Sequence, residues 1–154
     1  MNPNIPIKEI MTTDLTTVKN SDSVKHIRAL FERNNFHHLL VLDSLGKLSG
    51  IISKEDFYKF TYTLSMQTTG RTWSKHQYES IVAADIMTES PFVLDPDDTI
   101  GLAADLFLAN RFHALPVVEV DSLLGILTSH DLLKHCFKSP VAPQESEPFN
   151  EVKS

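Results

Sequence analysis

The sequence contains one long pattern twice, and this repeat restricts the chain to folds built from two matched units. Ile10-Met11-Thr12 recurs as Ile86-Met87-Thr88, an offset of 76 residues. Gly50-Ile51-Ile52-Ser53 recurs as Gly125-Ile126-Leu127-Thr128, and its offset of 75 implies a one-residue deletion in the preceding turn. Agreement over about 50 positions with a single gap indicates an internal duplication.

Each copy has the pattern of a mixed unit of strands and helices. Short apolar or β-branched segments predict strands, and polar capping residues precede segments with helical spacing. The first copy is expected to have a strand at 15–18, a helix starting near 21–23, strands at 39–42 and 48–52, and a helix capped by Ser53. The second is expected to have a strand at 92–94, a helix starting near 97–99, strands at 115–118 and 123–127, and a helix capped by Thr128. The fold class predicted is α+β, a tandem repeat of two β-α-β-β-α motifs.

The same alignment divides the chain into segments. Residues 1–64 form the first copy and residues 81–137 the second. Residues 65–80 are mainly polar and are expected to be a linker, with a short helical turn at 76–82. Residues 138–154 contain three prolines and scattered glutamates, so a disordered tail is expected there.

Composition excludes several classes of protein. A single cysteine rules out an internal disulfide framework and the cysteine clusters of structural zinc sites. The apolar runs are too short to cross a bilayer, and the N-terminus does not resemble a signal peptide. These features predict a cytoplasmic protein with no membrane partner.

The net charge of −6 disfavours nucleic acid as a partner, but the charge is unevenly distributed. Residues 1–80 carry 10 basic and 8 acidic side chains, whereas residues 81–137 carry 2 basic and 9 acidic ones. The first copy is therefore better suited than the second to an anionic ligand.

The motifs of both copies resemble the CBS domain, the motif named after cystathionine beta-synthase. The second copy carries the resemblance in residues 85–88, 112–118 and 125–132, and the first copy in residues 9–12, 36–41 and 50–57. The motifs occur in the same order twice and span residues 5 to 137.

The resemblance implies a tandem pair, or Bateman module, whose two sheets pack face to face about a pseudo-twofold axis. The resemblance further implies that the clefts between the repeats bind adenosine-containing ligands (AMP, ADP, ATP or S-adenosylmethionine). They commonly form homodimers and act allosterically on an enzyme, channel or transporter. This chain has no room for such a domain, so its output is expected to pass through a separate, unidentified protein partner.

The clearest candidate site is the pattern Ser/Thr-x-x-Asp at the start of each closing helix, Ser53 to Asp56 and Thr128 to Asp131. A helix N-terminus presents free N–H groups and the positive end of the dipole, which suits a phosphate. The resemblance gives the aspartate the role of accepting both ribose hydroxyls. The same pattern is also a capping box, in which case it needs no ligand.

Histidines at the start of a strand in each copy are further candidates. The resemblance places His37, His38 and His113 where family members often hold phosphate, although each is equally well explained as a polar residue bonded to backbone. Copy two has Ala114 in place of His38, and Ser129 in place of Lys54, so copy one is better equipped for a polyphosphate.

The resemblance also implies an apolar slot for adenine. Its expected positions are Thr16 and Val18 in the first copy, and Ala84 and Val93 in the second. Pro116 is a further expected ligand-binding residue, with no part of the ligand assigned to it. Core packing explains most of these residues as well as a ligand does.

Two functions other than nucleotide sensing are alternatives: that of an enzyme or metal protein, and that of a scaffold. The seven histidines form no His-Glu-x-x-His pattern, and no Gly-x-Ser-x-Gly motif or phosphate-binding glycine loop occurs, so neither enzyme activity nor a metal site is expected. The other alternative is a dimerisation or scaffold module whose clefts bind nothing. Retention of both Asp56 and Asp131 favours nucleotide binding over that scaffold.

Overall fold

The computed structural model describes residues 2–67, 80–110 and 112–138 of the chain. The disordered tail expected from residue 138 lies outside these ranges except for Lys138. Most of the helical turn expected at 76–82 also lies outside them.

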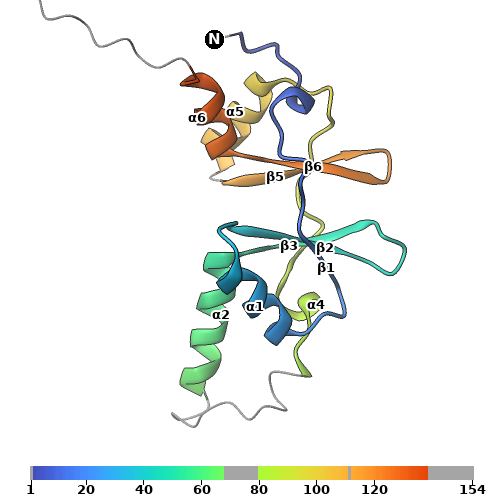
Figure 1. Cartoon of the computed structure of the whole chain (residues 1–154), viewed down its shortest axis with the longest axis vertical. Helices are drawn as coiled ribbons and strands as arrows, with labels where there is room; N and C mark the ends of the chain where they lie inside the picture. Colours follow the sequence, from blue (N-terminus) through green and yellow to red (C-terminus); the bar gives the residue numbers. More distant parts are fainter. Residues whose placement is uncertain (1, 68–79, 111, 139–154) are drawn as a thin grey trace, which may run out of the picture.

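The first copy forms a sheet with helices on one side (Figure 1). A parallel pair joins β1 (Thr17–Lys19) to β2 (His38–Leu42), and β2 is antiparallel to β3 (Leu48–Ser53). Helix α1 (Val24–Arg33) begins after Ser23, whose hydroxyl accepts a hydrogen bond from the His26 amide at 3.2 Å. Helix α2 (Lys54–Gln67) follows β3 directly.

The second copy repeats this arrangement above the first in Figure 1. Strands β5 (Ala114–Glu119) and β6 (Ser122–Thr128) form an antiparallel hairpin, and Leu94 makes a parallel bridge to Val117 where the first copy has β1. Helices α5 (Ile100–Asn110) and α6 (Ser129–Cys136) cover the outer side. The α+β tandem repeat expected from the sequence is therefore confirmed.

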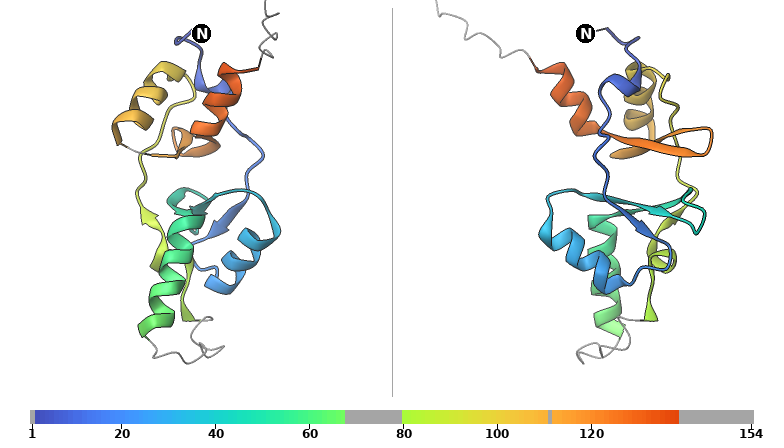
Figure 2. Two further views of the ribbon diagram at one scale, coloured as in Figure 1. Left: turned by 90° about the vertical axis from the view of Figure 1, so that its left-hand side faces the viewer. Right: turned by 45° about the vertical axis from the view of Figure 1, so that its right-hand side comes forward.

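The crossing segment at the start of each copy, around Thr12 in the first and Thr88 in the second, packs against the other copy. Thr12 pairs with Ile126 of β6 through N–O distances of 2.9 and 3.0 Å, and β4 (Thr88–Glu89) pairs with β3 through Thr88 and Ile51. These two crossing segments run on opposite sides of the molecule (Figure 2, left). Two short helices flank them, η1 (Ile7–Glu9) and α4 (Ala83–Ile86). The two copies therefore fold as one intertwined unit.

Three apolar clusters hold this unit together. One lies under α1 and α2 and includes Ala83 from the start of the second copy, and another lies under α5 and includes Ile7 from the start of the first. The third joins the two sheets through Leu40, Ala114 and Ile126, each at most 8% exposed. The sheets thus face each other with the helices outside, as burial of both apolar faces requires.

The β5–β6 turn contains a strained residue. Val120 adopts a φ of 56° and is 93% exposed, a conformation that a β-branched side chain strongly disfavours. Val120→Asn is expected to stabilise the protein by about 1 kcal/mol, because asparagine tolerates this region and no buried contact is lost. That gain corresponds to a rise in Tm of about 2–4 °C in a scanning calorimeter. An unchanged or lower Tm would show that the turn is not strained.

Candidate functional site

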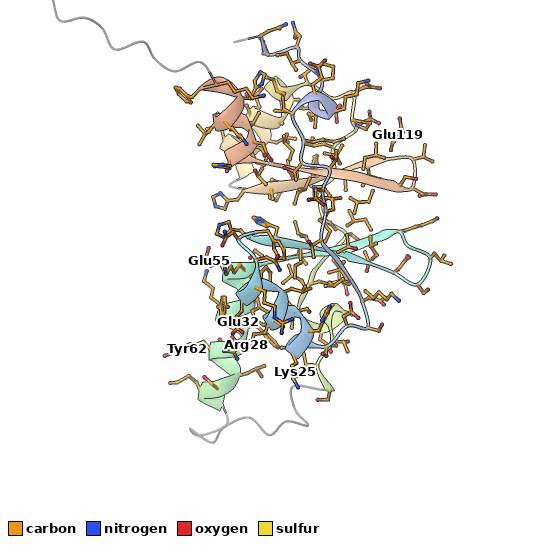
Figure 3. All side chains as sticks on the ribbon, viewed as in Figure 1. Lys25, Arg28, Glu32, Glu55, Tyr62 and Glu119 are labelled. Carbon is orange, nitrogen blue, oxygen red and sulfur yellow. The ribbon has the colours of Figure 1, made fainter. Side chains whose placement is uncertain are left out.

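A cavity of about 1160 Å³ lies where the two sheets meet the first turns of α2 and α6. Matching parts of both copies line it. They are the two helix starts (53–56 and 128–131), the two strand entrances (35–38 and 112–115), and the crossing segments at Thr12, Thr88 and 90–92. Glu55, labelled in Figure 3, marks the end of α2 that points towards this space.

The first-copy helix start leaves its aspartate available. The Ser53 hydroxyl accepts a hydrogen bond from the Asp56 amide at 3.0 Å, which fixes the first turn of α2. The Lys54 amide donates to the His37 carbonyl at 2.7 Å and ties the helix to the strand entrance. Among the described residues, no group donates a hydrogen bond to the exposed Asp56 carboxylate.

The second-copy helix start forms a closed capping box. One carboxylate oxygen of Asp131 accepts from the Thr128 amide at 2.8 Å and from its hydroxyl at 2.7 Å. The Thr128 hydroxyl in turn accepts from the Asp131 amide at 3.1 Å. The other carboxylate oxygen accepts from the Thr12 hydroxyl at 3.3 Å.

Four histidines line the cavity, His37 and His38 from the first copy and His113 and His130 from the second, together with the buried Ala114. Burial lowers the pKa of His38 below its ordinary value of 6.5. The neighbouring His37 and His113 lower it further, while Asp56 acts in the opposite direction. Together these effects favour the neutral form of His38.

Nine of the residues expected in the site line the cavity: His37, His38, Ser53, Lys54, Asp56, His113, Ala114, Thr128 and Asp131. The other five expected residues, which include the four expected to bind adenine, do not line the cavity. Val18 is 2% exposed in the first-copy core, and Pro116 is buried in β5 with its carbonyl bonded to the Leu94 amide at 2.9 Å. Thr16, Ala84 and Val93 also lie outside the cavity lining.

The aromatic surface of the cavity comes instead from Phe92 and Phe112. Their rings stack with centroids 6.3 Å apart and an interplanar angle of 25°, and they are 53% and 37% exposed. Sequence reasoning missed both. The signal lies in the alignment of the two copies. At an offset of 76 residues, Phe92 aligns with Thr16 and Phe112 aligns with Phe36.

The family model described as CBS domain matches residues 7–62 and again residues 82–138. The chain belongs to the CBS-domain family. Its two matched regions are the two copies seen in the fold, so the molecule is a CBS pair.

Solved CBS pairs share this architecture. CBSX2 of Arabidopsis thaliana is 28% identical with a TM-score of 0.72, over 88% of this chain and 96% of that one. A crystal structure of CBSX2 in complex with AMP is 29% identical, with a TM-score of 0.72 over 86% and 96% of the two chains. The CBS pair of protein MJ0100 from a complex with 5′-methylthioadenosine and S-adenosyl-L-methionine has a TM-score of 0.70 at 22% identity and supports the fold alone, over 88% and 98%.

Relatives by sequence fall into two groups. Protein MJ1426 of Methanocaldococcus jannaschii is 32% identical over 151 residues, which cover 83% of this chain and 89% of that protein. Others are longer, and the chain spans only 31% of protein MJ1404 of the same organism and 23% of the L-aspartate semialdehyde sulfurtransferase of Methanosarcina acetivorans. CBS pairs thus occur both as most of a protein and as a part of larger enzymes.

Residues 2–67, 80–110 and 112–138 contain neither a metal-binding cluster nor a membrane-spanning helix. Within these ranges no three metal-binding side chains gather around a point where an ion would fit. In the same ranges, no helix combines the length and hydropathy needed to span a bilayer.

Proposed function

We propose that this CBS pair binds an adenine nucleotide in the cavity and signals its presence to a separate protein partner. The observation that carries the proposal is the cavity itself, which brings four histidines, an aromatic pair, a helix N-terminus and the Asp56 carboxylate, which accepts no hydrogen bond from the described residues, into one space. The AMP complex of CBSX2, at 29% identity, supports AMP as the first ligand to test.

Each part of a nucleotide has a matching chemistry in the cavity. The Asp56 carboxylate suits the ribose diol, because two acceptor oxygens match two hydroxyl donors. The N-terminus of α2, with Lys54, His37 and His38, suits phosphate. The stacked Phe92 and Phe112 offer an apolar face to the base.

The proposed output is a shift between conformations. A ligand between the copies contacts both and favours one relative orientation, which a partner can distinguish. We further propose a cytoplasmic homodimer, for which the exposed apolar side chains on α5 and α6 are candidate contacts: Leu102, Leu108, Leu133 and Phe137. Light scattering at several protein concentrations tests self-association.

A ligand panel tests the proposed function. AMP, ADP, ATP and S-adenosylmethionine are added to the full chain, and Tm is measured by differential scanning fluorimetry. A ligand at about 100 times its Kd stabilises the folded state by about 2.7 kcal/mol, which corresponds to about 5–10 °C. If none of the four moves Tm, the cavity binds no adenosine ligand and the scaffold function replaces this one.

Binding of AMP is expected to take up a proton. The pKa of His38 lies below 6.5 in the free protein, and a bound phosphate would raise it by favouring the imidazolium. Affinity for AMP should therefore rise as pH falls from about 8 to 6, by up to about tenfold for a pKa change of one unit. Calorimetry in two buffers of different ionisation enthalpy measures the proton uptake.

Two controls separate His38 from other groups that titrate. Adenosine, which lacks the phosphate, should bind without proton uptake, and His38→Gln should reduce the uptake seen with AMP. The same depressed pKa makes His38 stabilise the free protein above pH 6.5, and this contribution is lost as pH falls below that value. Equal AMP affinity at pH 6 and pH 8 would contradict the assignment.

A further inference from the structure

We propose that the cavity holds one nucleotide per chain, bound through Asp56, and that Asp131 is a helix cap rather than a second ribose ligand. This inference rests on the proposed function and adds its stoichiometry and the residue that sets it. The two aspartates occupy matching places in the repeat, so any difference between them comes from their contacts.

Asp131 is already engaged by donors of its own chain. Both of its carboxylate oxygens accept hydrogen bonds, at 2.7 and 2.8 Å from Thr128 and at 3.3 Å from Thr12. A diol that bound both oxygens would compete with these donors, and leaving the half-buried Thr128 donors unpaired is costly. Asp56, in contrast, is exposed and keeps its carboxylate oxygens free of hydrogen bonds from the described residues.

Neighbouring substitutions between the copies point the same way. Lys54 follows Ser53, whereas the uncharged Ser129 follows Thr128. His38 lines the cavity, whereas its counterpart Ala114 provides neither charge nor a side-chain donor. Lys54 and His38 therefore lie beside Asp56, whereas at the next matched position the first copy has Glu55 and the second has His130.

The aromatic pair lies on the second-copy side of the cavity. The contact of Thr12 with Asp131 places the first crossing segment beside the start of α6. In the matching position, Thr88 pairs with Ile51, two residues before Ser53, but the pairing is antiparallel, and the Ser90 amide donates to the Ser49 carbonyl at 3.3 Å as the chain leads away from α2. Phe92 then stacks on Phe112 of the second copy and lines the cavity, whereas its repeat counterpart Thr16 does not line it.

Isothermal titration of the full chain with AMP tests the proposal. We expect one AMP per chain. Asp56→Asn should weaken binding by at least about tenfold, since a bond to a charged group is lost, and should leave Tm almost unchanged. Asp131→Asn should keep the affinity within about threefold but lower Tm by several degrees, because the capping box is weakened.

A second matched pair of variants keeps the proposal testable if the Asp131 variant fails to fold. Phe92→Ala should weaken AMP binding by about tenfold through loss of stacking, and Thr16→Ala at the equivalent position should leave it unchanged. Two AMP molecules per chain, or loss of binding in Thr16→Ala with Phe92→Ala unaffected, would overturn this inference while leaving the proposed function intact. Absence of AMP binding to the wild-type chain would overturn both.

Discussion

Phe31→Ala is expected to lower the free energy of unfolding by about 4 kcal/mol. Phe31 is fully buried, and its ring centroid lies 5.5 Å from that of Phe57 and 5.9 Å from that of Phe36. Removing the ring leaves a cavity at the centre of the first-copy core, because α1 and α2 are both anchored to strands and cannot close the space. Urea denaturation followed by circular dichroism measures the change.

The repeat supplies the control for this truncation. Phe107 is the counterpart of Phe31 in the second copy but is only half-buried. Phe107→Ala should therefore cost about 2 kcal/mol, in proportion to the smaller area that it buries. Equal losses in the two variants, or a loss below about 1 kcal/mol for Phe31→Ala, would show that the first-copy core is not organised around this aromatic cluster.

Gly125→Ala is expected to destabilise the protein by about 3 kcal/mol. A Cβ at this position would lie 2.8 Å from the Thr12 carbonyl oxygen and 2.8 Å from the Met11 sulfur of the first crossing segment. The Thr12 carbonyl is fixed by its hydrogen bond from the Ile126 amide at 3.0 Å, so the segment cannot move aside without breaking the pair. The substitution therefore strains the joint between the copies.

Gly50→Ala, the variant at the equivalent position of the first copy, should destabilise the protein to a similar extent. At Gly50 a Cβ would contact the Met87 sulfur and lie 2.9 Å from the Thr88 carbonyl oxygen. Gly101→Ala is the control, since its nearest neighbours belong to Pro3 near the chain terminus and alanine favours the helix, so we expect a change below about 1 kcal/mol. Chemical denaturation of the three variants measures the change in the free energy of unfolding. Near-neutral Gly50→Ala and Gly125→Ala would contradict the tight crossing of the two segments.

Much of the fold is readable from the sequence because its signals are local. Ser23 and Ser53 cap helices where expected, and the two short apolar runs of each copy mark its hairpin. The sequence does not indicate which strand each crossing segment pairs with. The apolar character of Ile7 shows that it is buried, but nothing nearby indicates that it packs in the core of the second copy.

The site was only partly predictable for the same reason. Helix-start motifs identify Asp56 and Asp131 as candidates, but the contact that distinguishes them joins Asp131 to Thr12, 119 residues away in sequence. The residues expected to form an adenine slot lie outside the cavity lining, and Val18 among them is buried in the first-copy core. Phe92 has the opposite property, since an aromatic residue before a strand looks like core until its exposure is known.

A crystal structure of the full chain with AMP tests the central claim most directly. The account predicts one nucleotide in the cavity, with its ribose hydroxyls within hydrogen-bond distance of the Asp56 carboxylate and its base against Phe92. Asp131 should keep its bonds to Thr128 and Thr12 in that complex. AMP bound to Asp131 with the Asp56 half empty, or bound outside the cavity, would contradict it.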